Sequence, residues 1–199
     1  MPDLFKRKSA EYDNNDRIKV RSLAIGSCIK QNIDLDDQMR VMDFGAGTGL
    51  ISSQLAPYVK EVTAIDISES MLQKLVQKPE LMGKVHILCQ DLLKQPTGIE
   101  YDLIVSAMAL HHIENTKSLI KRLYEHLKID GQIAMADLDI EPGTFHSNDV
   151  EGIFHYGFDR EELKKLLQEH GFKQVKFFTA HTEIKEDMTY PIFLVTAKK

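Results

Sequence analysis

Short apolar runs and segments with helical periodicity alternate along the chain. The apolar runs lie at 40–44, 61–65, 84–89, 101–106 and 132–138, and between most of them apolar residues recur at helical spacing. Strands that alternate with helices predict parallel βαβ units with right-handed crossovers. Because Val, Ile, Leu and Ala dominate the runs, we expect helices on both faces of the sheet. The pattern therefore predicts an α/β fold with a mostly parallel sheet.

The N-terminal part of the chain is expected to contain a helix. Apolar residues repeat with helical spacing from 15 to 33, and Asn14 or Asn15 can cap that helix. Residues 3–14 are polar, and two interpretations stay open for them. They form either a frayed terminus or a flap whose Tyr12 closes over a bound molecule.

Capping residues and chain breakers delimit the later elements. Ser68, Asn115 and Asp159 are predicted to cap three helices. The turn 128–131, which contains Asp130 and Gly131, is predicted to end the helix that begins at Asn115. The runs 173–179 and 189–197 are close enough in sequence to pair as antiparallel strands.

Composition narrows the class of protein. The chain has 199 residues, 43% hydrophobic and 28% charged, which suits one globular domain over 1–199. Its net charge of −5 gives no overall basic field for nucleic acid, and no apolar stretch reaches the roughly 20 residues that span a membrane. Cys28 and Cys89 lie in apolar-periodic segments without metal-ligand spacing. We interpret them as reduced core residues of a cytoplasmic protein.

The stretch 41–50 carries the first sign of chemistry. It begins as an apolar run, places glycines at Gly45, Gly47 and Gly49, and resumes as an amphipathic segment. This pattern is typical of a strand, a tight turn and the start of a helix. Glycine lets backbone N–H groups approach a ligand closely. The dinucleotide pattern G-x-G-x-x-G would require glycine at Leu50, so nicotinamide and flavin are disfavoured.

Polar residues follow the next predicted strands. Asp66, Asp91 and Ser106 each stand at a strand's carboxyl end, so they should face one crevice with the glycine turn. The Asp66 carboxylate can accept hydrogen bonds from the vicinal hydroxyls of a ribose. Asp91 and the N–H of Leu92 can form hydrogen bonds with an adenine. The adenine ring would then lie between the apolar side chains of Ile67, Met71 and Leu92.

Together these motifs resemble one family. The sequences Val-Met-Asp-Phe-Gly-Ala-Gly-Thr-Gly at 41–49, Ala-Ile-Asp-Ile-Ser at 64–68, Gln-Asp-Leu at 90–92 and Tyr-Asp-Leu-Ile-Val-Ser at 101–106 are similar to the successive motifs of class I S-adenosylmethionine-dependent methyltransferases. The resemblance covers about 38–139 and implies a Rossmann-like sheet of seven strands, the last antiparallel. It also implies that residues 1–34 form an N-terminal helical cover. It implies S-adenosyl-L-methionine as cofactor, held by Tyr12, Asp43, Gly45, Ala46, Gly47, Gly49, Asp66, Ile67, Met71, Asp91, Leu92, Ser106 and Ala107. Within that set, Asp43 would support the amino group, and Ser106 and Ala107 would lie beside the sulfonium.

The methyl acceptor is expected beyond the fourth and fifth strands. His111 or His112 could accept a proton from it, although packing or capping is the alternative role for both. The segment 139–157 combines polar and aromatic residues, which favours a lid or substrate wall over a solvated loop, with His146, His155 and Tyr156 on the substrate side. A metal held by Asp137, Asp139, His146 and His155 is conceivable, but their spacing matches no standard site, so no metal is predicted.

The sequence therefore predicts methyl transfer from S-adenosylmethionine to a small molecule. Two alternatives stay open: a cofactor-binding regulatory or partner-binding protein, and a protein methyltransferase. Nucleic acid is disfavoured as the acceptor for two reasons. The net charge is negative, and the sequence at 106–109 is Ser-Ala-Met-Ala in place of an Asn/Asp-Pro-Pro-Tyr motif. The atom that is methylated and the oligomeric state do not follow from the sequence.

Overall fold

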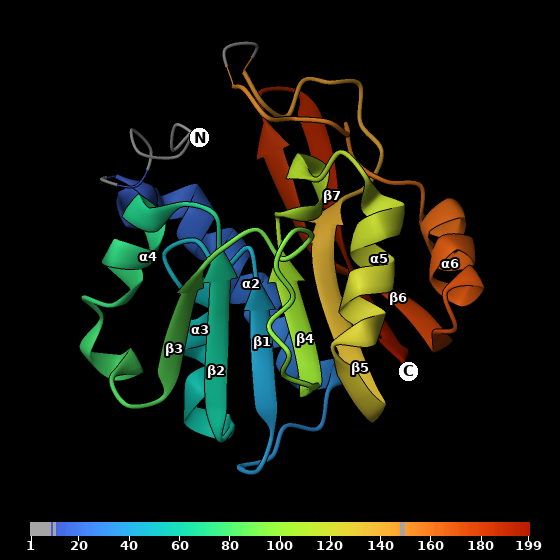
Figure 1. The fold of residues 1–199 in the computed structure, drawn as a ribbon. Coiled ribbons are helices and arrows are strands. Elements are labelled where there is room, and N and C mark those ends of the chain that lie inside the picture. Colours follow the sequence, from blue (N-terminus) through green and yellow to red (C-terminus); the bar gives the residue numbers. More distant parts are fainter. Residues whose placement is uncertain (1–8, 10, 148–149) are drawn as a thin grey trace.

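A computed structural model describes residues 9, 11–147 and 150–199 and contains one seven-stranded sheet in the order β3-β2-β1-β4-β5-β7-β6 (Figure 1). The strands are β1 (Arg40–Phe44), β2 (Glu61–Asp66), β3 (Val85–Cys89), β4 (Tyr101–Ala107), β5 (Leu127–Leu138), β6 (Lys173–Lys185) and β7 (Met188–Lys198). The α-helices are α2 (Asp16–Asn32), α3 (Leu50–Leu55), α4 (Glu69–Leu75), α5 (Thr116–Glu125) and α6 (Arg160–Glu169). Short 3₁₀ turns lie at η1 (Tyr12–Asn14), η2 (Ala56–Tyr58), η3 (Pro79–Leu81) and η4 (Leu110–His112).

The strand order places a topological switch beside β1. The chain runs outward from β1 through β2 to β3, then returns to the other side of β1 with β4. Both neighbours pair parallel with β1, and Phe44 stands opposite Ile65 on one side and Ser106 on the other. Their carboxyl ends therefore meet at one edge, where open α/β sheets bind ligands. The predicted antiparallel last strand is confirmed, because β7 runs antiparallel to both β5 and β6.

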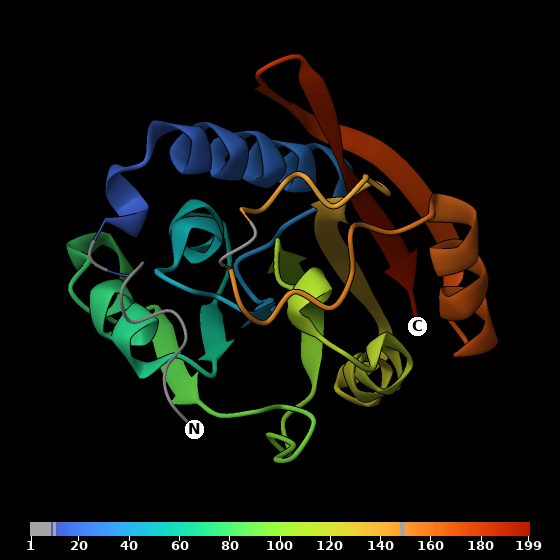
Figure 2. The ribbon, with the colours of Figure 1, turned by 90° about the horizontal axis from the view of Figure 1, so that it is seen from above.

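Helices pack on both faces of the sheet, as the apolar runs predict. Side chains alternate along β1, so Val41 belongs to one core and Met42 and Phe44 to the other. The first core holds residues of α2, α3 and α4, and the second holds those of α5 and α6. Seen from the ligand-binding edge, α2 lies across one side of the sheet and reaches toward the β6–β7 hairpin (Figure 2).

The predicted helix caps are confirmed. The side chains of Asn15, Ser68, Asn115 and Asp159 accept hydrogen bonds from backbone N–H groups in the first turns of α2, α4, α5 and α6. Each cap satisfies donors that the helix itself leaves unpaired. Short polar side chains before apolar-periodic segments therefore fixed these helix starts.

Two local predictions are wrong. Residues 128–131 are not a separate turn but part of β5, where Asp130 has a φ of 62° and the pairing with β4 shifts register between Tyr101 and Leu103. Because an irregularity within a strand requires the same residue types as a turn, the segment 128–131 resembles a turn in the sequence. Cys89 is exposed rather than in the core, because β3 is an edge strand with little cover, whereas Cys28 is buried.

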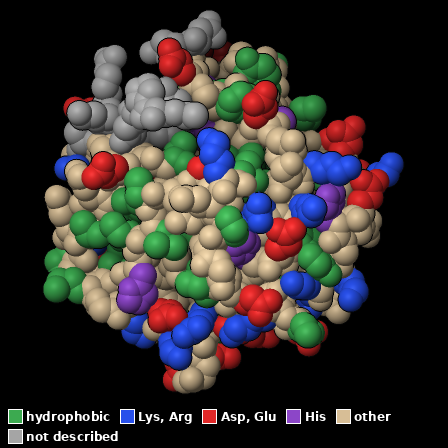
Figure 3. All heavy atoms as spheres, in the orientation of Figure 1, with side chains coloured by type: hydrophobic (Ala, Val, Ile, Leu, Met, Phe, Trp, Pro, Cys, Tyr) green, Lys and Arg blue, Asp and Glu red, His purple; other side chains and the backbone are tan. Residues whose placement is uncertain are grey.

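Charged side chains of both signs are intermingled over the face that α5 and α6 cover (Figure 3). Within the described part of the chain, no helix is long and apolar enough to cross a membrane.

Candidate active site

A cleft opens at the switch point between β1 and β4. It encloses about 830 Å³ between its atoms, the open mouth included. Side chains and backbone from the carboxyl ends of β1, β2, β3 and β4 line it, together with residues of η1, α4 and η4. The lining is formed by Tyr12, Phe44, Gly45, Gly47, Ile65, Asp66, Ile67, Met71, Gln90, Asp91, Leu92, Leu93, Ala107, Met108, Ala109, His112 and Ile113.

The glycine turn forms the floor where β1 passes into α3. Gly49 caps α3 with a φ of +81°, and a Cβ there would lie 2.7 Å from Leu75 Cγ. Gly47 has a φ of +54°, yet a Cβ there would meet no described protein atom within 4 Å. Gly49 is therefore required by packing within the protein, whereas the space above Gly47 is open toward the cleft.

Asp66 supports this turn from the end of β2. Its Oδ2 accepts a hydrogen bond from the N–H of Gly47 at 2.7 Å, and its Oδ1 accepts one from the N–H of Ser68 at 2.8 Å. An ionised carboxylate offers about four lone-pair sites, so it can accept several hydrogen bonds at once. The Asp66 carboxylate thus both orders the glycine turn and faces the cleft.

Asp91 occupies the corresponding position at the end of β3. Burial alone would raise the pKa of Asp91, but hydrogen bonds from Lys94 and the N–H of Leu93 outweigh it and hold the pKa below its usual value. The Lys94 ammonium lies 2.8 Å from the carboxylate and the Leu93 nitrogen 3.0 Å. Asp91 is therefore ionised at neutral pH, beside the apolar side chain of Leu92.

Asp43 lies beneath the turn and does not line the cleft. Its side chain is 1% exposed, and its Oδ2 accepts a hydrogen bond from Ser52 Oγ on α3 at 2.6 Å. Burial raises the pKa of Asp43 to about 6, although the bond from Ser52 partly opposes the rise. Asp43 is thus a buried carboxylate that changes charge within the pH range of ordinary assays.

Tyr12 lines the cleft from the N-terminal segment. The next residue, Asp13, accepts a hydrogen bond from Thr48 in the glycine turn and forms an ion pair with Lys78 at 2.8 Å. Burial raises the pKa of the Tyr12 hydroxyl, which Arg21 contacts through a hydrogen bond that opposes the rise. These contacts hold Tyr12 against the turn; the rest of the predicted flap, residues 3–8 and 10, lies outside the described residues.

The two neighbouring histidines have different environments. His111 is 1% exposed, and its Nδ1 donates to Asp137 Oδ1 at 2.7 Å. Burial raises the pKa of Asp137, but His111 outweighs this and keeps it below its usual value. His112 lines the cleft, and its Nδ1 lies 2.7 Å from the carbonyl oxygen of Gly152. Because a carbonyl only accepts, the neutral His112 ring carries its proton on Nδ1 and its lone pair on Nε2.

The segment 139–157 packs against this histidine pair. The N–H of Phe154 donates to the His111 carbonyl at 2.9 Å, and the His146 ring centroid lies 4.9 Å from that of His111. His155 is not among the residues that line the cleft, and its Nε2 donates to the carbonyl of Ile113 at 2.9 Å.

Other polar residues of this segment point elsewhere. Tyr156 is 59% exposed, and Asp139 forms a two-point ion pair with Arg160, with both distances 2.7 Å. Within the described residues, no three His, Cys, Asp or Glu side chains meet as a metal site.

Most of the residues expected to hold the cofactor line the cleft, but Asp43, Ala46, Gly49 and Ser106 lie behind the lining. Ser106 is fully buried, and its Oγ donates to the carbonyl of Phe44 at 2.9 Å, which joins β4 to β1. Sequence reasoning missed Phe44, Ile65, Gln90, Leu93, Met108, Ala109 and Ile113. All stand within a few positions of a predicted residue, so the strand ends themselves were the available signal.

Comparison with known protein families gives a match to the one described as "Methyltransferase domain", over residues 42–133. An uncharacterised methyltransferase of Schizosaccharomyces pombe is 35% identical over 120 residues, covering 55% of this chain and 42% of the relative. The malonyl-[acyl-carrier protein] O-methyltransferase of Bacillus anthracis is 25% identical over 167 residues, covering 82% of this chain and 59% of the relative. The chain thus spans about half the length of these curated relatives.

Among solved structures, the N-methyltransferase NodS of Bradyrhizobium japonicum in complex with S-adenosyl-l-homocysteine superposes with a TM-score of 0.72. The superposition covers 94% of this chain and 89% of NodS at 17% sequence identity, so it establishes a common fold.

Proposed function

The chain belongs to the class I S-adenosylmethionine-dependent methyltransferase family, and we propose that it transfers a methyl group from this cofactor to a small-molecule acceptor. One observation carries the proposal. The glycine turn, Asp66 and Asp91 with Leu92 come from three different strands and line a single cleft. A nucleoside with a charged tail needs that combination of close backbone, hydroxyl acceptors and an apolar ring pocket.

The lining fits this cofactor. Gly47 faces open space, and a side chain at this position would occupy that space. The backbone is therefore accessible where the methionine part of the cofactor would bind. Asp66 would accept the ribose hydroxyls, and Asp91 with the N–H of Leu92 would read the adenine. Ile67 and Met71 line the cleft beside them and would pack on the ring. Asp43 and Ser106 lie behind the lining and would act through the turn or through water.

When bound, the cofactor supplies an electrophilic methyl group on a sulfonium, which an acceptor displaces in line. The protein has to orient the acceptor, exclude water and remove a proton where the acceptor carries one. We propose His112 as the base, because its side chain lines the cleft and the hydrogen bond between its Nδ1 and the Gly152 carbonyl fixes the orientation of the ring.

His111 would be a positioning residue. Its side chain is buried against Asp137, and its carbonyl accepts from Phe154, so it joins η4 to the segment 139–157. His146, which contacts both histidine rings, would stand on the acceptor side. We expect less of His155 and Tyr156, whose side chains are directed elsewhere.

A labelled cofactor tests the proposal. The protein is incubated with S-adenosylmethionine carrying a labelled methyl group and with cell extract that has been separated into low-mass and macromolecular fractions. Label that enters a low-mass compound supports the proposal, whereas label that enters only protein supports a protein methyltransferase. Cofactor binding without turnover in any fraction favours a regulatory or partner-binding role. Cytoplasmic location stays a prediction, which detection of the protein in cell fractions would test.

A further inference from the structure

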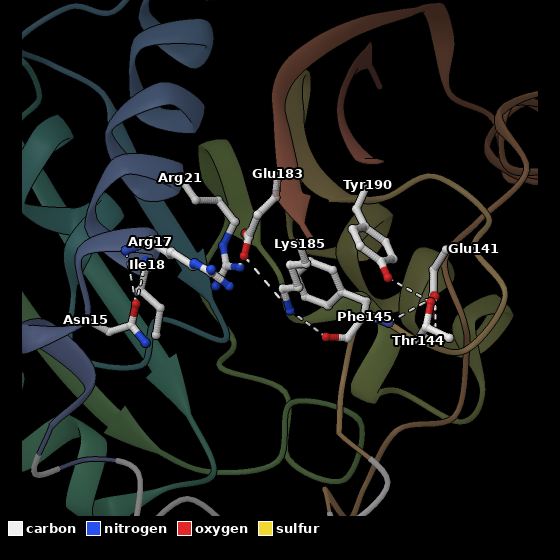
Figure 4. Close-up of polar contacts among 10 residues, drawn as sticks. All are labelled: Asn15, Arg17, Ile18, Arg21, Glu141, Thr144, Phe145, Glu183, Lys185 and Tyr190. Atoms are coloured by element: carbon white, nitrogen blue, oxygen red, sulfur yellow. Dashed lines mark hydrogen bonds and ion pairs between the residues drawn. The ribbon is translucent and has the colours of Figure 1, made fainter. Parts of the chain in front are cut away.

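Three basic side chains gather between α2 and the end of β6 (Figure 4). Arg17 and Arg21 extend from α2 toward β6, where Lys185 stands near the end of the strand (Figure 4). We refer to Arg17, Arg21 and Lys185 as the cationic cluster. Glu183 is the carboxylate in contact with it, and Figure 4 shows the segment 141–145 closing the other side.

Arg21 and Glu183 form the buried base of the cluster. Arg21 Nη1 donates to Glu183 Oε2 at 2.8 Å, and the two side chains are 11% and 6% exposed. This pair neutralises one cation with one carboxylate. The positive charge that Arg17 and Lys185 add therefore has no equally close counterpart among the described residues.

Lys185 is held rigidly above Phe145. Its Nζ donates to the Phe145 carbonyl at 2.6 Å and lies 3.8 Å from the centroid of the Phe145 ring. The nearer carboxylate oxygen of Glu183 is 3.9 Å away. Burial lowers the pKa of Lys185, and the charges of Arg21 and Arg17 lower it further, whereas the carboxylates of Glu183 and Glu141 oppose this. An added anion would relieve that repulsion.

Arg17 supplies a second cation at the surface. It stands in the first turn of α2, is exposed, and has no ion-pair partner within the described residues. Arg17 and Arg21 are four positions apart, so they lie on the same face of the helix. The Arg17 side chain extends beside the buried pair toward Lys185 (Figure 4).

Two neighbouring segments connect the cationic cluster to the candidate active site. Arg21 contacts the hydroxyl of Tyr12, which lines the cleft. Phe145 is followed by His146, whose ring centroid lies 6.2 Å from that of His112, another lining residue. A molecule that presents its nucleophile near His112 would therefore extend toward Arg17 and Lys185.

We propose that Arg17 and Lys185 bind an anionic group, a carboxylate or a phosphate, of the methyl acceptor. The inference rests on the proposed function, since it assigns the chemical class of the acceptor for the same site. Guanidinium and ammonium groups suit such anions, and partial burial strengthens the contact relative to one in water. The buried Arg21–Glu183 pair fixes the two elements that carry them.

Direct binding is the first test, because it does not require turnover. Inorganic phosphate and acetate are titrated at constant ionic strength into protein saturated with S-adenosylhomocysteine, and Arg and Lys side-chain NMR signals are followed. We expect saturable binding of at least one anion, weakened at least about fivefold by Arg17→Met and by Lys185→Met. Lys185→Arg should restore it. Lys19→Met and Lys173→Met remove exposed charges from the same two elements outside the cluster, so they should not change it.

Turnover is the second test. Low-mass extract is separated by anion exchange before the labelled methyl transfer is measured. We expect the acceptor in the retained fraction. Arg17→Met and Lys185→Met should raise the amount needed for half-maximal rate at least about fivefold, whereas the rate at saturation stays near that of the parent protein.

The two proposals fail in distinguishable ways. An acceptor that is not retained, with turnover unaffected by Arg17→Met and Lys185→Met, overturns the anion site and leaves methyl transfer intact. If no fraction is methylated, methyl transfer to a small molecule fails, and the titration alone decides the anion site. Absence of saturable phosphate and acetate binding, or equal binding by the cluster variants and Lys19→Met, then overturns it.

Discussion

Asp43 is a carboxylate that the fold keeps at an energetic cost. Its pKa is raised to about 6 by burial, so between the unfolded value of 3.8 and about 6 the folded protein holds a proton that the unfolded chain has lost. Stability contributed by this residue is thus greatest at low pH and falls as pH rises through that window. Ionised Asp43 is tolerable if it supports the ammonium group of the cofactor.

Asp43→Asn should therefore separate stability from binding. We expect the variant without cofactor to gain up to about 3 kcal/mol of unfolding free energy at pH 7, and little at pH 4, because Asn carries no charge and can still accept from Ser52. Its affinity for S-adenosylhomocysteine should fall, and the weakening of parent binding below about pH 6 should disappear. Urea unfolding and calorimetry at several pH values measure both. Equal pH profiles for the two proteins would contradict the assigned role.

His112 is the residue on which proton removal would depend. His112→Gln should lower the rate at saturating acceptor by about 10²–10⁴-fold, while cofactor affinity changes little. His170→Gln is a matched control, because His170 Nδ1 also bonds a backbone carbonyl, but at the end of α6. A His112 variant that keeps the rate of the parent protein would show that no base acts at this position.

The turn between β1 and α3 is the element that sequence predicts best. The local sequence specifies a strand, a turn and a helix, because three glycines lie between an apolar run and an amphipathic segment. Strand β1 has the predicted bounds Arg40–Phe44. Elements whose form depends on distant partners were predicted less well. The β5 irregularity at 128–131 arises from its register with β4, and β3 owes its exposure to its edge position, so neither is encoded locally.

Gly49 should be more sensitive than a glycine of similar backbone in an open loop. Gly49→Ala adds a Cβ 2.7 Å from Leu75 Cγ at a φ of +81°, whereas Gly98→Ala has a φ of +70° and no described atom within 4 Å. Each substitution should cost about 1–2 kcal/mol for the left-handed conformation. Gly49→Ala should cost about 1–3 kcal/mol more for the overlap. Chemical unfolding of both variants measures the difference. Equal losses of unfolding free energy would mean that the overlap with Leu75 does not destabilise the protein.

At the scale of the molecule, the Arg21–Glu183 pair joins the first described helix to the last hairpin. Arg21→Met should destabilise the protein by about 3–5 kcal/mol, because it leaves the Glu183 carboxylate buried without its partner. The double variant Arg21→Met/Glu183→Leu should recover most of that loss. If 1–199 is one domain, each variant should unfold in a single transition. A double variant no more stable than Arg21→Met would contradict this account of the pair.

Sequence reasoning could reach the donor side of the site but not the acceptor side. Asp66 and Asp91 follow strands at regular intervals, so topology brings them together. Arg21 and Glu183 are 162 positions apart, and only the completed fold brings α2 to β6. The different roles of His111 and His112 likewise depend on Asp137 and Gly152, which the local sequence does not specify.

Calorimetric titration with S-adenosylhomocysteine tests the central claim, that the cleft at the β1–β4 switch point holds the cofactor. We expect one saturable site in the parent protein and a loss of about 1.5–3 kcal/mol of binding free energy in Asp66→Asn, since charge-assisted hydrogen bonds to the ribose are removed. Asp37→Asn, which changes an exposed carboxylate in the turn before β1, should bind like the parent. Absence of binding by the folded parent protein, or unchanged affinity in Asp66→Asn, would contradict the account.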